Sequence, residues 1–287
     1  MHHDNLEAFL RHRGGRLAKG PVALIFAEDL VEVASTLRHH LDLGFREVLL
    51  FAPDALDLEA ELEAQVERIG FRIEGPDAHL PLVNRVIEAA PGQWLYYGFN
   101  AEYLFFPFCE SRSIGEMLAF HTEERREAML TTVVDLYAGD LGAAPDGVSR
   151  EGAHLDGKGY YSEPRLGEDG KPLERQVNIF GGLRWRFEEH VPPTRRRIDR
   201  IGLFRAKTGL NLHADHTLSE PEMNTIACPW HHNLTAAICS FRAAKALKSN
   251  AGTGFDVAHF TWPDARPFSW NSQQLMDLGL MEPGQWF

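Results

Sequence analysis

The sequence predicts an α/β fold with a mostly parallel, doubly wound sheet. Two continuous apolar runs, at residues 22–27 and 47–52, have the length of strands and the unbroken apolarity of strands buried on both faces. Between them, residues 29–43 carry apolar side chains at helical spacing. A second helical stretch, 56–69, precedes a short strand at 71–75. This alternation is typical of parallel strands that are joined by right-handed crossovers.

Local signals support these elements and those that follow them. Gly44 and Gly70 are expected to cap the first and second helices, because glycine readily adopts the left-handed conformation found there. Ser113 and Glu116 have the spacing of a capping box at the start of a further helix. The next expected elements are a helix at 80–90, a strand at 94–106, a helix at 113–120 and a strand at 129–138.

The second half of the chain predicts fewer regular elements. Residues 139–174 are polar and glycine-rich without a clear period, which indicates a functional or disordered loop. Residues 236–247 predict a short amphipathic helix. We therefore expect three parts, which are an N-terminal extension at 1–20, one domain at 21–248 and a C-terminal tail at 249–287 packed on that domain.

Composition narrows the classes of function. The chain has 287 residues and a formal net charge of −12, which argues against general nucleic-acid binding because that function leaves a basic footprint. Its three cysteines are widely spaced and match neither a disulfide framework nor a zinc pattern, so a reducing compartment is expected. No apolar run resembles a signal peptide or a transmembrane segment. We expect a cytoplasmic protein, and peripheral association with a membrane stays open.

One stretch carries a family pattern. Residues 94–118, WLYYGFNAEYLFFPFCESRSIGEML, resemble the bacterial family 2-like glycosyltransferases, which carry W-L-x-F-x-D-x-D-E-F-L-x-x-P at this point. The matching residues are Trp94, Leu95, Glu102, Leu104 and Pro107, with Tyr103 in place of the Phe. Further segments that resemble this family, in the same order along the chain, are VVDLYAGD (133–140), IFGGLRWRF (179–187), HADHTLS (213–219) and AAICSFRAAKAL (236–247).

The resemblance implies a three-layer nucleotide-diphospho-sugar transferase fold (GT-A, Rossmann-like) with a mostly parallel central sheet. It also implies transfer of a sugar from a nucleotide-sugar donor to a glycan or surface-polysaccharide acceptor. In the family, the two Asp of the D-x-D motif hold Mg²⁺ or Mn²⁺ against the donor diphosphate, where the ion stabilises the leaving group. Those two positions are Phe99 and Ala101 here, and neither side chain can ligate a metal. The neighbouring Glu102 and Asn100 would bind Mg²⁺ only weakly, so no cofactor is certain and Mg²⁺ or Mn²⁺ stays open.

Three interpretations of this altered motif stay open. In the first, arginines stabilise the diphosphate in place of a metal, since the guanidinium fork binds phosphate bidentately; the alternative for these arginines is a solvated basic face. The arginines concerned are Arg184, Arg186, Arg195, Arg196, Arg197 and Arg200. In the second, the chain is a catalytically inactive homologue that binds sugar or nucleotide, or acts as a scaffold. In the third, another acidic pair such as Asp135 and Asp140 is used.

The candidate site residues follow from these patterns. The expected catalytic residues are Glu102, as the retained acid of the motif, and Asp135, as a general base. An acid in the loop at 139–156 is the alternative for the general base. The expected donor-binding residues are Glu28, Asp29, Asp57, Asn100, His216, Arg184 and Arg186. Asp29 is alternatively a helix N-cap, and either Asp54 or Asp57 is expected to be one. A zinc site is the less favoured alternative for four histidines, which are otherwise structural: His213, His216, His231 and His232.

Overall fold

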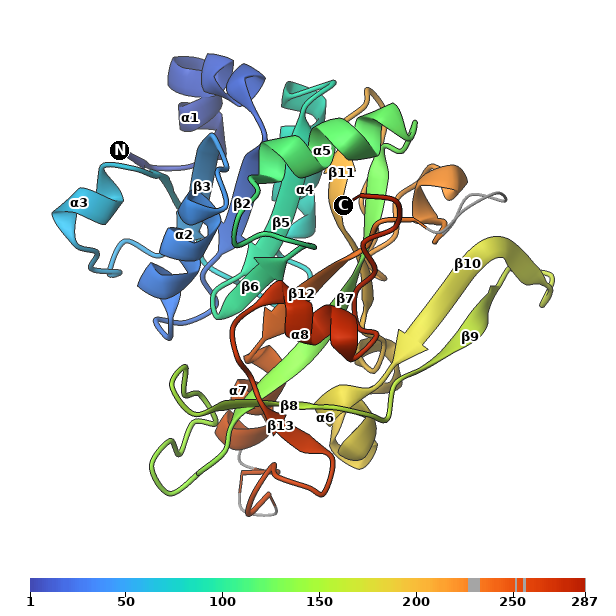
Figure 1. The fold of residues 1–287 in the computed structure, drawn as a ribbon. Helices are drawn as coiled ribbons and strands as arrows, with labels where there is room; N and C mark the ends of the chain where they lie inside the picture. The colour runs from blue at the N-terminus through green and yellow to red at the C-terminus, as the bar shows by residue number, and fades with distance from the viewer. Residues whose placement is uncertain (227–232, 251, 255–256, 287) are drawn as a thin grey trace. The chain divides into compact units, whose positions relative to one another are not determined.

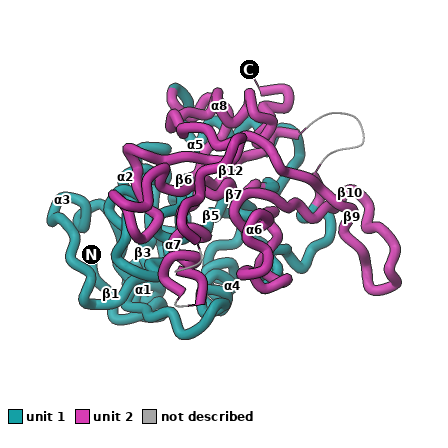
Figure 2. Tube along the Cα trace, turned by 90° about the horizontal axis from the view of Figure 1, so that it is seen from below, with its two compact units in different colours: residues 1–103, 111–130, 201–224 teal, residues 104–110, 131–200, 225–287 magenta. Residues whose placement is uncertain are grey.

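A computed structural model describes residues 1–226, 233–250, 252–254 and 257–286. It is a mixed α/β structure with a large, mostly parallel central sheet, as the sequence predicts (Figure 1). The chain forms two compact units, which are coloured separately in Figure 2. Unit 1 comprises residues 1–103, 111–130 and 201–224, and unit 2 comprises residues 104–110, 131–200 and 225–287.

Unit 1 is built on five parallel strands. Their order is β1-β4-β3-β2-β5, and each pairs in parallel with its neighbours. Their bounds are His2–His3 for β1, Glu67–Gly70 for β4, Glu47–Ala52 for β3, Val22–Phe26 for β2 and Trp94–Phe99 for β5. Strand β11 (Asp199–Arg205) pairs with β5 antiparallel through its residues in this unit. Phe26, at the end of β2, pairs with both Phe51 and Phe99, so three carboxyl ends meet at one edge.

Helices accompany these strands within unit 1. They are α1 (Leu6–Arg13), η1 (Gly14–Lys19), α2 (Val33–Asp42), α3 (Ala60–Glu63), α4 (Leu80–Ala89), α5 (Ile114–Glu123) and η4 (Pro221–Asn224). The core contains apolar side chains from both the strands and the helices, and the rings of Phe26 and Phe51 stack in it at 4.6 Å. Every residue of β2 and β3 is buried, as the apolar sequence of β2 and of β3 after Glu47 predicts.

Several local predictions are confirmed in unit 1. The strands at 22–27 and 47–52 and the helix at 80–90 form within a residue of the expected bounds. Gly44 follows α2 with a φ of 90°, and Ser113 forms the expected capping box with Glu116 at the start of α5. The strand at 94–106 does form, but a turn at Asn100 and Ala101 divides it into β5 and β6 (Glu102–Phe105).

The predicted helix at 56–69 and strand at 71–75 are wrong. Only the four residues of α3 are helical, and Glu67–Gly70 form β4, between β3 and β1. Gly70 therefore ends a strand and caps no helix. Tertiary partners explain the difference, because the buried Glu67 carboxylate pairs with His3 (2.8 Å) and Arg13 (2.9 Å). These long-range contacts outweigh the local helical pattern of an acidic segment.

Unit 2 combines a small sheet with a separate hairpin. Strand β7 (Ala128–Ala138), through its residues in this unit, pairs in parallel with β12 (Ala236–Ser240) and antiparallel with β8 (Ala153–Asp156). Strand β13 (Ala265–Pro267) extends this sheet from β8, and β9 (Tyr161–Leu166) and β10 (Pro172–Phe180) form the hairpin. The helices are α6 (Gly182–Arg186), η2 (Glu188–His190), η3 (Pro193–Arg195), α7 (Arg242–Ser249) and α8 (Ser272–Asp277).

Two predictions change in unit 2. The expected helix at 236–247 is instead β12 followed by α7, because the apolar run 236–240 pairs with β7 and only the charged part after Phe241 is helical. A short apolar run cannot be assigned to strand or helix by its period alone. The expected loop at 139–174 contains β8, β9 and the start of β10. Among the described residues, no helix is long and apolar enough to cross a membrane.

The buried His40 of α2 makes the stability of the protein depend on pH. Its Nδ1 lies 2.8 Å from the Thr36 carbonyl oxygen, and its ring stacks on Tyr96 at 4.9 Å. Burial, and secondarily the neighbouring His39, lowers the pKa of His40 to about 3. The unfolded chain, in which a histidine has a pKa of about 6.5, therefore takes up the proton first as the pH falls.

We predict that His40 contributes its full stabilisation above about pH 6.5 and loses it at about 1.4 kcal/mol per pH unit on acidification. The free energy of unfolding of His40→Phe, measured by urea denaturation at each pH, should fall less between pH 6.5 and 4.5 than that of the natural protein. The two slopes should differ by about 1.4 kcal/mol per pH unit. The matched control is His12→Phe on the exposed side of α1, which should follow the natural protein. Equal slopes in all three proteins would show that His40 is not neutral in the fold.

Candidate functional site

The carboxyl edge of unit 1 brings together three of the predicted donor-binding residues. Strands β2 and β5 are neighbours that run in parallel and end at the paired Phe26 and Phe99. The segment after β2 contains Glu28 and Asp29, and Asn100 directly follows β5. In open α/β sheets, ligands bind in the crevice outside the carboxyl ends of the strands. These residues are therefore at the edge where such a fold places its ligand.

Asn100 holds the segment after β2 in place. Its side chain is fully buried, and its Oδ1 accepts a hydrogen bond from the Glu28 backbone N–H at 2.8 Å. Its Nδ2 donates to the Asp29 carboxylate at 2.5 Å and to the Val31 carbonyl at 2.8 Å. Since both ends of the amide are engaged in the protein, Asn100 acts on a ligand only indirectly, by positioning the exposed Glu28 and Asp29.

The motif positions that usually hold a metal lie inside unit 1. Phe99 packs against His79 with ring centroids 5.0 Å apart, and Ala101 is fully buried with a φ of 59°. The Ala101 N–H donates to the Thr36 hydroxyl at 2.8 Å. Glu102 is also fully buried, and its carboxylate accepts the Phe99 N–H at 3.0 Å. The retained acid of the motif thus closes the turn between β5 and β6.

The two remaining candidates of unit 1 have different surroundings. His216 is half-buried with a φ of 63°, and its Nδ1 lies 3.0 Å from the Tyr97 hydroxyl of β5. Asp57 is exposed between β3 and α3, and among the described residues its side chain forms no hydrogen bond. Asp29, Asp54 and Asp57 are not helix N-caps, because Glu32 holds that position in α2 and Glu59 holds it in α3. The carboxylate of Asp29 instead accepts the Val31 N–H at 2.9 Å.

The alternative zinc site of four histidines has few of its ligands among the described residues. His213 is exposed, whereas the ring of His216 stacks against Tyr97. His231 and His232 lie outside the described residues. In the part of the chain that the structure describes, no group of three or more His, Cys, Asp or Glu side chains is arranged to hold a metal ion.

Unit 2 contains a buried carboxylate that is paired with an arginine. Asp135 points inward from β7, and Arg184 of α6 approaches it twice, with Nε 3.3 Å from Oδ1 and the backbone N–H 3.3 Å from Oδ2. Burial raises the pKa of Asp135, and the Arg184 charge opposes this shift. The side chain of Arg184 remains 15% exposed while that of Asp135 is 0% exposed, so the arginine alone can meet a ligand.

A second buried acid repeats this arrangement. Asp156 of β8 lies 3.1 Å from Arg186 Nε and accepts a hydrogen bond from the Tyr137 hydroxyl at 2.7 Å. The Arg186 guanidinium lies over the rings of Tyr137 and Trp262, at 5.5 and 5.1 Å. Burial raises the pKa of Asp156, and the negative charge of Asp156 in turn raises that of Asp135. The two acids therefore belong to one electrostatic cluster.

Two glycines allow α6 to approach this cluster. Gly182 has a φ of 64°, and a Cβ added to it would lie 2.9 Å from Asp135 Oδ2. A Cβ on Gly181 would lie 2.3 Å from the Tyr160 ring. The pair Gly181-Gly182 thus sets the start of α6 against the acids, and the spacing of Arg184 and Arg186 provides one guanidinium for each. Sequence reasoning included Asp156 only as one of the acids of the loop at 139–156. It missed Tyr137 and these glycines, although adjacent glycines before an R-x-R pattern are a usable signal.

The other arginines do not form a solvated basic face. The buried Asp199 pairs with Arg197 and with Arg165 (2.7 Å), and Arg196 pairs with Glu188 at 3.3 Å. Arg200 is among the largest fully buried side chains, and Arg195 lies in η3. The alternative pair of Asp135 and Asp140 receives no support, because Asp140 is exposed and accepts the N–H of Gly142 at 2.8 Å. Most of the predicted arginine cluster is thus engaged in ion pairs within the protein.

Comparison of the chain with models of known protein families and with characterised protein sequences finds no match. Function must therefore be argued from the residues and their geometry.

We predict that Asn100→Ala destabilises the protein by about 2–4 kcal/mol, because it leaves the Glu28 N–H and the Val31 carbonyl without their partner. Chemical denaturation measures this change. Asn5→Ala is the matched control, since Asn5 caps α1 through one bond to Ala8 N (2.9 Å) and should cost about 1 kcal/mol. An equal cost at both positions would contradict the role of Asn100 as a clamp.

Gly182→Ala should destabilise the protein by clearly more than the strain of a left-handed alanine, which is about 1–2 kcal/mol. The excess arises because the added methyl group meets the Asp135 carboxylate. Gly209→Ala is the matched control, with a φ of 82° and no heavy atom within 4 Å of the added Cβ. Thermal unfolding of both variants tests the close approach, which is disproved if the two lose equal stability.

Proposed function

We propose that this chain is a glycosyltransferase-like protein of the GT-A type, which transfers a sugar from a nucleotide-sugar donor to a glycan or surface-polysaccharide acceptor. The observation that carries the proposal is the carboxyl edge of β2 and β5, where Asn100 holds Glu28 and Asp29. Exposed carboxylates at this edge suit the hydroxyl groups of a ribose and the N–H groups of a base, which are hydrogen-bond donors.

Unit 2, taken by itself, holds arginines that suit the charged part of the chemistry. When the sugar is transferred, the oxygen of an acceptor hydroxyl group bonds to the anomeric carbon as the bond from that carbon to the diphosphate breaks. The hydroxyl proton passes to the released diphosphate or to water, and negative charge develops on the leaving group. Arg184 and Arg186 are held by buried carboxylates, so their guanidinium groups are positioned before a ligand binds. A positioned cation stabilises developing charge without the cost of reorganisation. Phe99 and Ala101 have no ligating atoms, so a metal at the usual motif positions has no place in this scheme.

Within this proposal Asp135 is a positioning residue. A general base must reach the proton that it removes, and the Asp135 side chain is enclosed and in contact with Arg184. Its buried carboxylate instead fixes the orientation of the guanidinium. Glu102 likewise maintains the turn that carries Asn100 through its bond to Phe99 N.

The enclosed position of Glu102 favours one second candidate, a catalytically inactive homologue that binds a nucleotide or sugar. The single acid retained from the family motif is fully buried, so it does not reach a ligand from its present place. Both candidates bind nucleotide at the same edge. They differ in turnover, because only a transferase releases nucleoside diphosphate from the donor.

We predict that calorimetric titration with UDP or GDP shows saturable binding that is unchanged by EDTA. Glu28→Ala should weaken it by at least about tenfold, as expected for the loss of a charge-assisted hydrogen bond. Glu88→Ala, which removes an exposed acid of α4, is the matched control and should bind normally. Absence of nucleotide binding would refute the proposal, and tight binding only with Mn²⁺ would refute its metal-free form.

The same nucleotides separate the two candidates. Release of UDP from UDP-glucose or of GDP from GDP-mannose, above the rate without protein, supports the transferase. Binding of these donors without release supports the inactive homologue.

A further inference from the structure

A cavity lies at the opposite edge of unit 1. It has a volume of about 900 Å³ and is formed by the segments before β2, β3 and β5 together with one face of α5. Because these segments precede their strands, the cavity lies at the amino ends of the parallel sheet. The proposed nucleotide site is at the carboxyl ends. This cavity therefore lies on a different surface from the proposed nucleotide site and takes no part in the proposed transfer reaction.

Glycines keep the cavity open. Four of them line it, and a Cβ on Gly92 would meet no heavy atom within 4 Å. A Cβ on Gly115 would meet only the Ser113 hydroxyl, at 3.9 Å. The volume falls within the range of about 300–1,000 Å³ that is usual for small-molecule sites. It therefore has room for a ligand of several rings.

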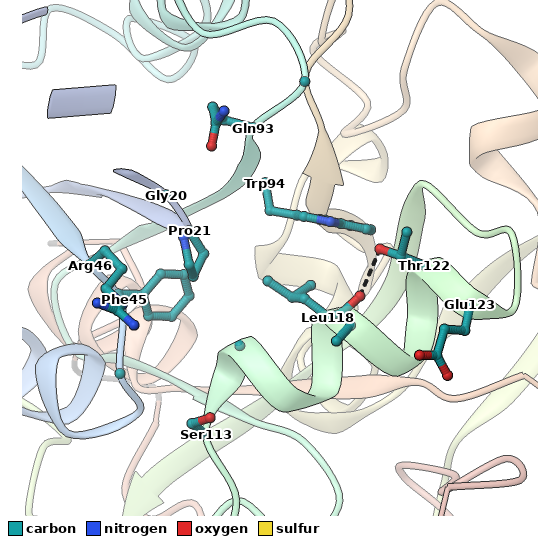
Figure 3. Close-up of a pocket in the computed structure, with 14 residues that line it drawn as sticks. Gly20, Pro21, Phe45, Arg46, Gln93, Trp94, Ser113, Leu118, Thr122 and Glu123 are labelled. Atoms are coloured by element: carbon teal, nitrogen blue, oxygen red, sulfur yellow. Dashed lines mark hydrogen bonds between the residues drawn. The ribbon is translucent and has the colours of Figure 1, made fainter. Parts of the chain in front are cut away.

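The walls combine an aromatic plate with apolar contacts. Figure 3 shows Trp94 and Leu118 on one side of the cavity, opposite Pro21 and Phe45. Trp94 is half-buried, and its ring is braced by His121 in an edge contact with centroids 5.9 Å apart. The face of an aromatic ring carries partial negative charge and attracts C–H groups of a ligand that carry partial positive charge. Trp94 is thus a fixed platform for a flat, C–H-rich face.

Three polar side chains line the cavity at different points, with Gln93 near Trp94, Arg46 beside Phe45 and Glu123 beside Thr122 (Figure 3). In the described part of the chain, no ion pair or side-chain hydrogen bond engages Arg46, Gln93 or Glu123. Together they offer a guanidinium, an amide and a carboxylate, which can donate and accept hydrogen bonds in defined planes. One positive and one negative charge leave the cavity without net charge. A single arginine favours neither a diphosphate nor any other polyanion, and a single carboxylate does not make a metal site.

We propose that this cavity, which we call the amino-edge groove, binds a carbohydrate. An oligosaccharide offers a C–H face for Trp94 and, along its length, hydroxyl groups that donate to Glu123 and accept from Arg46 and Gln93. Residues of α5 and its N-cap line one wall of the groove (Figure 3). This inference does not depend on sugar transfer. A chain that binds no nucleotide would still hold a glycan here.

Titration with cellotetraose, maltotetraose and chitotetraose, followed by saturation-transfer NMR, tests the amino-edge groove. At least one tetrasaccharide should bind saturably to the full-length protein. Trp94→Ala and Gly115→Phe should each weaken binding at least tenfold, the first by removing the platform and the second by filling the groove without removing any group. Trp185→Ala, which removes a tryptophan of unit 2 that is 39% exposed, is the matched control and should bind normally.

If Trp94→Ala unfolds, Gly115→Phe still tests the groove, because a Cβ added at Gly115 meets only the Ser113 hydroxyl, at 3.9 Å. Thermal unfolding of each variant establishes that it is folded. Binding of none of the three tetrasaccharides overturns the proposal, as does equal binding by folded Gly115→Phe. Displacement of the tetrasaccharide by UDP or GDP would also overturn it, because the two ligands would then share one site. If the protein binds a tetrasaccharide but neither UDP nor GDP, the transferase proposal is refuted and the proposal for the amino-edge groove is unaffected.

Discussion

The parallel pairing of β2 with both β3 and β5 is the constraint on which unit 1 depends. A strand with neighbours on both sides and packing on both faces must be apolar at every position, and each residue of β2 is buried. The pairing also aligns the ends of three strands, so the segments that leave them meet at one edge. Residues that are distant in sequence, such as Glu28 and Asn100, become hydrogen-bonded neighbours for this reason.

The two edges of this sheet offer different chemistry because they are built from different ends of the same strands. At the carboxyl edge, Asn100 orders a short segment and leaves acids exposed. At the amino edge, glycines before the strands leave space beside Trp94. The proposed nucleotide site and the proposed glycan groove therefore do not compete for the same residues. Each can be altered without touching the other.

Unit 2 uses buried charge in a different way. Removing a carboxylate and a guanidinium from water is costly, and a buried ion pair recovers that cost only when its geometry and hydrogen bonds are good. Asp135 has two contacts from Arg184, and Asp156 has Arg186 and the Tyr137 hydroxyl. Such pairs are poor devices for stability alone, and they are well suited to fix the direction of an arginine. This is the physical basis for assigning the arginines a role toward an anionic ligand.

The sequence by itself determined the class of fold and the elements with a strong local signal. Unbroken apolar runs identify β2 and β3, and the capping box at Ser113 identifies the start of α5, because these signals depend on neighbouring residues. The tertiary structure decided what depends on distant partners. It made β4 from a segment with a helical pattern, enclosed Glu102, and set Asp135 and Asp156 against the arginines of α6. A local pattern reports the preference of a segment, whereas the burial of a charge is settled by the counter-charge that folding brings to it.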